Sequence, residues 1–195
     1  MRLQLVLVIA GCLSGAQSFF LQKPAVKSNP LIPDLQTLIN ESQGGADKSR
    51  EDEIKSLMVA ISESRTGDQR ESLSGQWDGI WTTEKEVNFF KTSWPFAKVS
   101  DITQDLDLYD AGMVKNSIKF EGGGQFAVTG AVMPVDSDGG YDRVAFEFKS
   151  AVVSGWGKQL SLPPLGTGWF DTMYCDNEYR LSKDLRGDWS IFRKR

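Results

Sequence analysis

The feature that most constrains this chain is a period-two hydrophobic pattern that begins at Gly75. Apolar and polar side chains alternate in residues 77–81, 101–108, 114–120, 126–132 and 143–152. Such alternation is typical of strands with one buried and one solvated face. Glycine-rich segments at 122–124 and 136–140 favour hairpin connections between these strands.

Three further apolar runs, at 168–175, 180–182 and 188–192, close the chain. They are rich in aromatic and β-branched residues and are bounded by turn formers, so they predict consecutive antiparallel strands. About eight antiparallel strands with one apolar face most economically close into a barrel without free edges. We therefore predict a mainly β fold, a lipocalin-like antiparallel β-barrel.

Two helices are predicted before the barrel, at residues 34–42 and 50–64. In the second, Ile54, Leu57, Met58 and Ile61 recur at the spacing that places them on one helix face. Gly44-Gly45 ends the first helix and Gly67 the second. The apolar face would pack against the barrel, or alternatively dock on a membrane or a partner protein.

Composition excludes several functions. The chain of 195 residues has 26 acidic and 22 basic residues and no histidine. Catalysis by a Ser-His-Asp or Cys-His arrangement is therefore impossible within it, and no metal-ligand spacing or phosphate-binding loop occurs. We expect no cofactor, and no nucleic acid as partner because a basic cluster is missing. Of the two cysteines, Cys12 and Cys175, the second lies in a predicted strand and is expected to be a packing residue.

The first eighteen residues predict a secretory-type signal peptide. Arg2 precedes an apolar run at residues 3–13, which is too short to span a bilayer comfortably. Ala16-Gln17-Ser18 then supplies the small residues that a signal peptidase reads.

The segment after the predicted cut starts with Phe19. It carries Lys23 and Lys27 but no acidic residue before Asp34, and residues 24–33 form a proline-containing linker. A signal peptide followed by phenylalanine and an acid-free basic segment resembles the two-part plastid address of algae with secondary plastids. Ordinary secretion is the alternative.

The barrel sequence also resembles a known family. The resemblance is carried by Leu73-Ser74-Gly75-Gln76-Trp77, by Thr82-Thr83, and by three C-terminal segments at 168–176, 179–182 and 186–188. These are similar to the motifs of the plastid lipid-associated protein family, also called fibrillins or plastoglobulins. The match spans about Leu73 to Arg193, and Trp81 stands where the family usually has tyrosine.

The resemblance favours plastid localisation, through the signal peptide and transit peptide, over secretion. We divide the chain into a signal peptide (1–18), a transit-peptide-like segment and linker (19–33), a helical region (34–66) and a lipocalin-like fibrillin domain (73–195). The family implies peripheral contact with plastoglobules or thylakoids and association with lipids, carotenoids or quinones.

A cavity for such molecules would lie inside the barrel. Gly79 and Gly130, if they point inward, would leave room beside large aromatic side chains. Those aromatic residues are Trp77, Trp81, Phe120, Phe126, Phe146 and Phe148. Core packing, with the glycines at bends in curved strands, is the alternative.

Four polar residues of the C-terminal motif, Asp171, Tyr174, Asp176 and Arg180, could rim the cavity. Arg180 could orient a ligand by pairing with a carboxylate or phosphate, or could pair with Asp171 across the hairpin. Asp176 is expected to start a turn with Asn177.

We predict a non-catalytic binding or structural protein for apolar small molecules. Ala127, Ala131, Met133 and the Trp94-Pro95-Phe96 loop are candidates for outer contact with lipid. A barrel isomerase that acts on a bound lipid or pigment is one alternative, with Asp171 or Tyr174 as its acid or base. A scaffold that binds a plastid lipid-biosynthetic enzyme through the helices is another.

Overall fold

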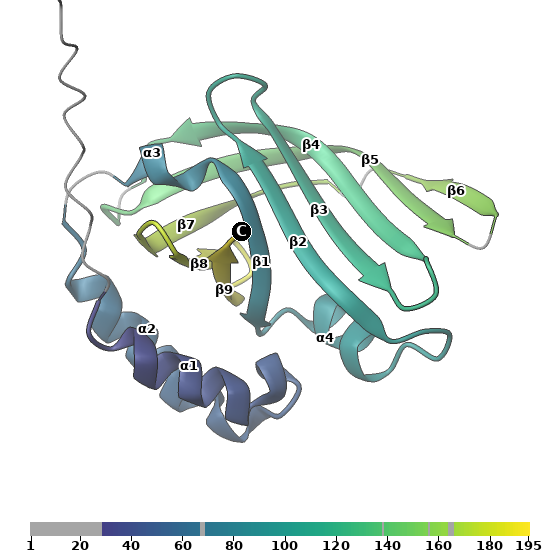
Figure 1. Cartoon of the computed structure of the whole chain (residues 1–195). Coiled ribbons are helices and arrows are strands. Elements are labelled where there is room, and N and C mark those ends of the chain that lie inside the picture. Colours follow the sequence, from purple (N-terminus) through teal and green to yellow (C-terminus); the bar gives the residue numbers. More distant parts are fainter. Residues whose placement is uncertain (1–28, 67–68, 138, 156, 164–165) are drawn as a thin grey trace, which may run out of the picture.

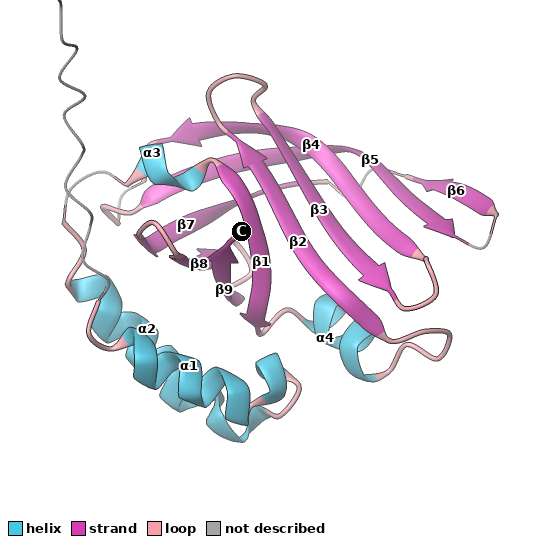
Figure 2. Cartoon of the chain, viewed as in Figure 1, coloured by secondary structure: helices cyan, strands magenta, loops and turns pink. Residues whose placement is uncertain are grey.

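The computed structural model describes residues 29–66, 69–137, 139–155, 157–163 and 166–195. In this part of the chain, eight antiparallel strands close into a barrel, and a helical region that includes the two predicted helices precedes it (Figure 1, Figure 2). The predicted fold class is confirmed. The predicted signal peptide and most of the predicted transit segment, residues 1–28, and Gly67, the expected end of the second helix, lie outside the described residues.

The barrel strands follow one another around the wall in chain order. They are β1 (Gly75–Thr82), β2 (Val99–Asp107), β3 (Met113–Phe120), β4 (Gln125–Val135), β5 (Asp142–Gly155), β7 (Thr167–Cys175), β8 (Tyr179–Asp184) and β9 (Trp189–Lys194). Pairing of β1 with β9 closes the barrel. The sequence did not predict β6 (Lys158–Leu162), which pairs with the second half of β5 as a hairpin beyond the barrel (Figure 1).

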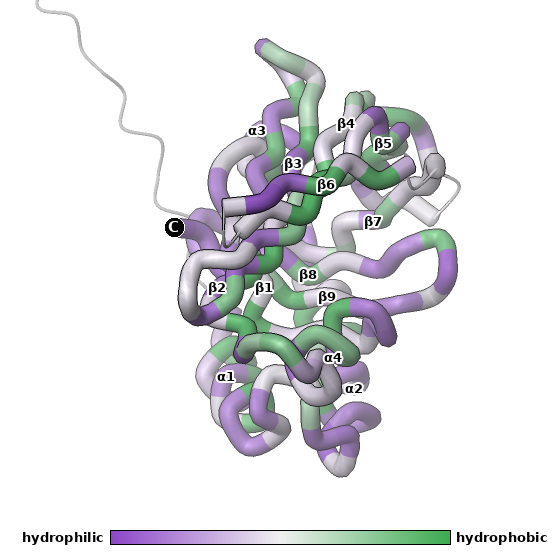
Figure 3. Tube along the Cα trace, turned by 90° about the vertical axis from the view of Figure 1, so that its right-hand side faces the viewer, coloured by the Kyte–Doolittle hydropathy of each residue, from purple (hydrophilic) through white to green (hydrophobic). Residues whose placement is uncertain are grey.

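Two amphipathic helices, α1 (Ile32–Glu41) and α2 (Glu51–Glu63), precede the barrel. Two short 3-10 turns, η1 (Gln43–Gly45) and η2 (Lys48–Arg50), connect them. Three acidic residues in the first turn of α2 suit the positive end of the helix dipole. Two helices were not predicted, the single turn α3 (Arg70–Leu73) and α4 (Lys85–Thr92). In Figure 3, α1, α2 and α4 gather on one side of the strands.

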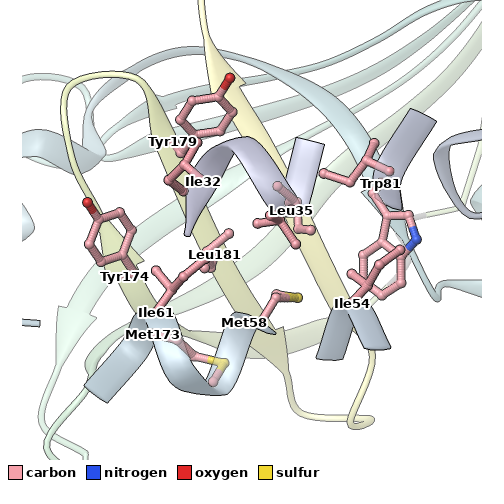
Figure 4. Packing of buried hydrophobic residues seen from close by; sticks show 12 residues of the cluster. Ile32, Leu35, Ile54, Met58, Ile61, Trp81, Met173, Tyr174, Tyr179 and Leu181 are labelled. Carbon is pink, nitrogen blue, oxygen red and sulfur yellow. The ribbon is translucent and has the colours of Figure 1, made fainter. Parts of the chain in front are cut away.

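The apolar faces of α1 and α2 pack on the outside of the barrel wall. Together with wall residues they form what we call the helix-side core: Ile32, Leu35, Ile39, Ile54, Met58, Ile61, Trp81, Met173, Tyr174, Tyr179, Leu181 and Ile191. Figure 4 shows Ile54 beside Trp81, and Met58 and Ile61 beside Leu181. The prediction that the helical apolar face packs against the barrel is therefore confirmed.

A second core fills the interior at one end of the barrel. This barrel core consists of Leu73, Trp77, Leu106, Leu108, Val114, Val132, Val144, Phe170 and Cys175. The Trp77 indole N–H donates to the Leu73 carbonyl of α3 at 2.8 Å. The end of the barrel near α3 is thus filled by side chains.

β-Bulges overturn two of the predicted inward positions. Gly79 pairs with Phe192 and Trp81 with Ile191, so Ile80 is an extra residue in β1. A bulge residue shifts the inside-outside alternation by one, and the Trp81 side chain therefore belongs to the helix-side core. Similarly, Lys149 is an extra residue in β5. Uninterrupted alternation from Val144 would place Val152 on the inner face, but Ala151, paired with inward Val128, takes that position.

Gly130 also serves a different purpose from the predicted one. A Cβ atom there would lie 2.3 Å from the Glu147 carbonyl oxygen and 2.8 Å from Phe148 Cα. Gly130 therefore permits close approach of β4 and β5 at the bulge, and it does not leave room for a ligand.

Candidate ligand cavity

A cavity of about 470 Å³ occupies the other half of the barrel interior. Side chains from every barrel strand and from α4 line it. Its volume lies in the range of about 300–1,000 Å³ that is typical of small-molecule sites. The cavity reaches the surface beside Glu86, Leu185 and Arg186, which are exposed. We call this end the mouth.

Apolar side chains form most of the cavity wall. They are Val87, Phe90, Ile102, Val114, Ile118, Phe126, Val128, Phe146, Phe148, Phe170, Leu185 and Phe192. The rings of Phe146 and Phe148 lie 4.8 Å apart at their centroids. Gly79 lines the cavity as predicted. Such a wall suits a hydrocarbon ligand because burial of apolar surface is favourable.

The most fully buried polar side chain of the cavity wall is that of Arg180 in β8. Its side chain is fully buried, and its guanidinium lies 4.2 Å from the Phe192 ring centroid and 4.9 Å from that of Trp77. Nη2 donates a hydrogen bond to Gln104 Oε1 on β2, whereas Nε and Nη1 have no hydrogen-bond partner. Burial lowers the pKa of Arg180 to about 10, because desolvation penalises the charged form.

Acidic residues surround the mouth. Glu84, Glu86, Asp184 and Asp188 all line it, with Arg186 among them. The Arg186 guanidinium lies 2.8 Å from Glu86 and 3.3 Å from Asp184. Burial and the neighbouring Asp184 raise the pKa of Glu84 above its ordinary value.

Helix α4 covers the mouth and is tied to the preceding helical region. Lys91 Nζ donates to the Gly44 carbonyl oxygen of η1 at 2.8 Å. Burial lowers the pKa of Lys91 to about 8, against a smaller opposing effect of Glu84. Phe90 stacks on Phe126 with 5.8 Å between ring centroids. Helix α4 therefore closes part of the mouth with the aromatic side chain of Phe90 and the ammonium group of Lys91.

The Trp94-Pro95-Phe96 loop packs beside the same cover. Trp94 lies 5.2 Å from Phe90 and 6.0 Å from Phe120 between ring centroids. Phe96 projects outward and is 74% exposed. The loop thus covers one end of the barrel and also presents one aromatic ring to the surroundings.

The structure brings together only some of the predicted site residues. Phe126, Phe146, Phe148 and Arg180 line the cavity, and Trp81 borders it while its ring packs in the helix-side core. Trp77 lies beneath Arg180 in the barrel core, and Phe120 packs behind Phe90 and Trp94.

The three other polar candidates lie outside the group that lines the cavity. Asp171 forms a two-point ion pair with Arg143 of β5, with N–O distances of 2.7 and 2.8 Å. The predicted alternative, a pair between Asp171 and Arg180, is therefore wrong. Asp171 faces Arg143 across the β5–β7 pairing, which joins strands that are not consecutive in the sequence.

Tyr174 and Asp176 hold the turn between β7 and β8. The Tyr174 hydroxyl donates to Asp176 Oδ2 at 2.8 Å, and the Glu178 backbone N–H donates to Oδ1 at 2.8 Å. The expected turn at Asp176 is confirmed. Burial, reinforced by Asp176, raises the pKa of Tyr174. An extra residue in β7, Met173, places the Tyr174 ring in the helix-side core.

Several cavity residues were missed by sequence reasoning. Gln104 and Asn116 lie on inner faces of predicted strands, but they are polar and were not expected there. Val87 and Phe90 belong to α4, whose three-residue spacing of apolar side chains was the available signal. Within the described ranges, no group of side chains is suited to hold a metal ion. None of the described helices has the length and hydrophobicity to cross a membrane.

Fold and site together define a class, a closed eight-stranded antiparallel barrel with an internal, largely apolar cavity. The PAP_fibrillin family model matches residues 30–193. Probable plastid-lipid-associated protein 11, chloroplastic, from Arabidopsis thaliana is 36% identical over 167 residues, which cover 80% of this chain and 76% of that protein. The chain therefore belongs to the PAP_fibrillin family, as its motifs predicted. No solved structure gave a significant match.

Proposed function

We propose that this protein is a non-catalytic plastid protein that holds one apolar small molecule inside its barrel. The cavity is the observation that carries the proposal, because its wall is apolar and one end is filled by the barrel core. Plastid localisation is supported by the chloroplastic relative and by the leader-like residues 1–33. The proposed cargo is a lipid, carotenoid or quinone, and exchange takes place at plastoglobules or thylakoids.

The contacts of Asp171, Tyr174 and the two N-terminal helices support a carrier over the two alternatives, an isomerase and an enzyme scaffold. Asp171 and Tyr174, which an isomerase would need, are occupied by Arg143 and Asp176. A scaffold that docks through the apolar faces of α1 and α2 would need these faces free, but they are buried in the helix-side core. A partner enzyme would therefore bind through the polar faces.

Peripheral contact with lipid has a separate structural basis. Met113 and Met133 are exposed on the outer face of β3 and β4, and Met113 pairs with exposed Ala131. Phe96 adds an exposed ring beside the mouth. We propose that Phe96 touches the lipid surface while cargo enters or leaves, and that Met113 and Met133, beside the filled end of the barrel, make a separate outer contact with lipid.

Fluorescence titration with N-phenylnaphthylamine, a neutral apolar probe, tests the proposal. We expect saturable binding of one probe per chain. Val128→Trp would fill the cavity and weaken binding at least about tenfold, whereas Ala131→Trp, on the outer face of the same strand, would leave the affinity unchanged. Equal effects of the two variants, or no saturable binding, would contradict the proposal.

A further inference from the structure

The Arg180 guanidinium at the base of the cavity indicates which head group the apolar ligand carries. We infer that the cavity binds an amphiphile with a single carboxylate head group, that Arg180 is its counter-charge, and that the hydrocarbon tail extends toward the mouth. This inference rests on the proposed function, which by itself requires only an apolar ligand.

Arg180 is a buried cation whose hydrogen bonds are incomplete. Two of its three guanidinium nitrogens, Nε and Nη1, have no partner. Among the described residues, no carboxylate forms an ion pair with it. A buried charge without a counter-charge is costly, and buried charges in proteins are normally paired. The missing partner is therefore an anion that can reach the cavity.

Aromatic rings hold the guanidinium but do not satisfy its N–H groups. Phe192, Trp77 and Phe170 lie 4.2, 4.9 and 5.4 Å from its carbon atom at their ring centroids. Such contacts stabilise a cation through the ring faces. They supply no oxygen acceptors for Nε and Nη1, so the group remains competent to bind an oxyanion.

Neighbouring polar side chains position the guanidinium. Gln104 Nε2 donates to Asn116 Oδ1 at 2.9 Å, which leaves Gln104 Oε1 to accept from Arg180. Ser182 lies on the same face of β8 as Arg180, lines the cavity and is buried without a partner for its hydroxyl group. Its hydroxyl is thus available as a second donor to a head group.

The distribution of charge favours a carboxylate over a multiply charged phosphate. Arg180 is the single cation at the base among the described cavity residues. The others, Lys91 and Arg186, lie near the mouth and are engaged by the Gly44 carbonyl and by carboxylates. One positive charge matches one negative charge, and the acidic mouth disfavours a dianion.

The tail of the ligand has one continuous apolar path. Ser182 and Arg180 mark the base, and Phe146, Phe148 and Phe126 line the wall toward α4. The head group therefore enters first and reaches the polar base, and the end of the tail lies near the mouth under Phe90.

Competition between an acid and its neutral ester tests this inference. The fluorescent probe is cis-parinaric acid, compared with its methyl ester, and the competitors are hexadecanoic acid, hexadecanol and hexadecyl phosphate. For the unmodified protein we expect the acid to bind roughly tenfold to a hundredfold tighter than the ester, because charge-assisted hydrogen bonds form only with the acid. Hexadecanoic acid should also displace the probe better than the alcohol or the phosphate does.

Arg180→Met should abolish the preference for the acid while N-phenylnaphthylamine still binds, which also shows that the variant is folded. Arg180→Lys should keep a smaller preference. Arg193→Met, which removes an exposed cation on β9 outside the cavity lining, is the matched control and should leave the preference intact. If Arg180→Met does not fold, the inference is tested by comparing the ratio of acid affinity to ester affinity in the unmodified protein and in Arg180→Lys. An equal ratio in the two proteins would overturn it.

Each contrary outcome has a distinct meaning. Binding of the neutral probe without preference for the acid, or a preference that survives in Arg180→Met, would overturn this inference and leave the proposed function intact. Stronger displacement by the phosphate would overturn the carboxylate assignment. Absence of binding by both the neutral probe and the acid would overturn the proposed function as well.

Discussion

Replacement of Ile54 by alanine tests whether α2 is an integral part of the fold. The Ile54 side chain is fully buried in the helix-side core, where it lies beside Trp81 (Figure 4). Truncation of a buried isoleucine to alanine costs about 2–5 kcal/mol in the free energy of unfolding, through lost burial and the cavity that remains. The better helix propensity of alanine returns roughly 0.5 kcal/mol.

Val59→Ala provides a matched control in the same helix. Val59 is also β-branched, so its replacement changes helix propensity similarly, but its side chain is 42% exposed. Its substitution should change the free energy of unfolding by no more than about 0.5 kcal/mol. The difference between the two variants therefore isolates the packing of α2 against the barrel.

Thermal unfolding followed by circular dichroism measures both variants. For a domain of this size, about 1 kcal/mol corresponds to about 2–4 °C in Tm. A net loss of roughly 1.5–4.5 kcal/mol in Ile54→Ala therefore lowers Tm by roughly 3–18 °C, in a single transition. Equal Tm values for Ile54→Ala and Val59→Ala would refute the argument that the helices are packed on the wall.

Three further predictions concern other parts of the structure. Gly130→Ala should lower the free energy of unfolding by roughly 1–3 kcal/mol in urea titrations, because the added methyl meets the backbone of β5. Gly139→Ala, whose methyl would make only an ordinary 3.5 Å contact, should be neutral, and similar values for both would exclude the close-approach argument. The Cys175 thiol should resist iodoacetamide at pH 8 until the protein unfolds, because burial raises its pKa to about 12. Rapid labelling of the native protein, detected by mass spectrometry, would contradict this. Glu84→Gln should raise Tm at pH 8 but not at pH 4. The folded-state pKa of Glu84 is raised, so its charged form destabilises the fold above that pKa. This penalty disappears as the pH falls and the carboxyl group is protonated. A Tm difference that is the same at both pH values would contradict this assignment.

The fold was predictable because alternation reports burial directly. Each of the five alternating segments became a strand, and the apolar face of residues 50–64 became a helix surface on the barrel. β6 is only five residues long and exposed, and its polar-apolar alternation covers just residues 159–162, so its sequence carried a weak signal. The α4 helix was missed because it is short and lies between a strand and a proline-containing loop.

The site was less predictable because it depends on bulges and on register. A period-two rule assumes that no residue is inserted, so it could not show that Ile80 and Met173 move Trp81 and Tyr174 to the outer face. The pairing of Asp171 with Arg143 depends on two strands that meet only after the barrel closes. Arg180 was found through a family motif, whereas its lack of a partner is visible only in three dimensions.

Extraction of the native cargo is the most direct test of the central claim that the barrel holds one small molecule. The protein would be purified from its own cells without detergent, extracted with organic solvent, and the released compounds quantified by mass spectrometry. The cavity predicts one dominant apolar compound at about one molecule per chain. A broad mixture of membrane lipids in large excess, or an empty protein, would contradict it.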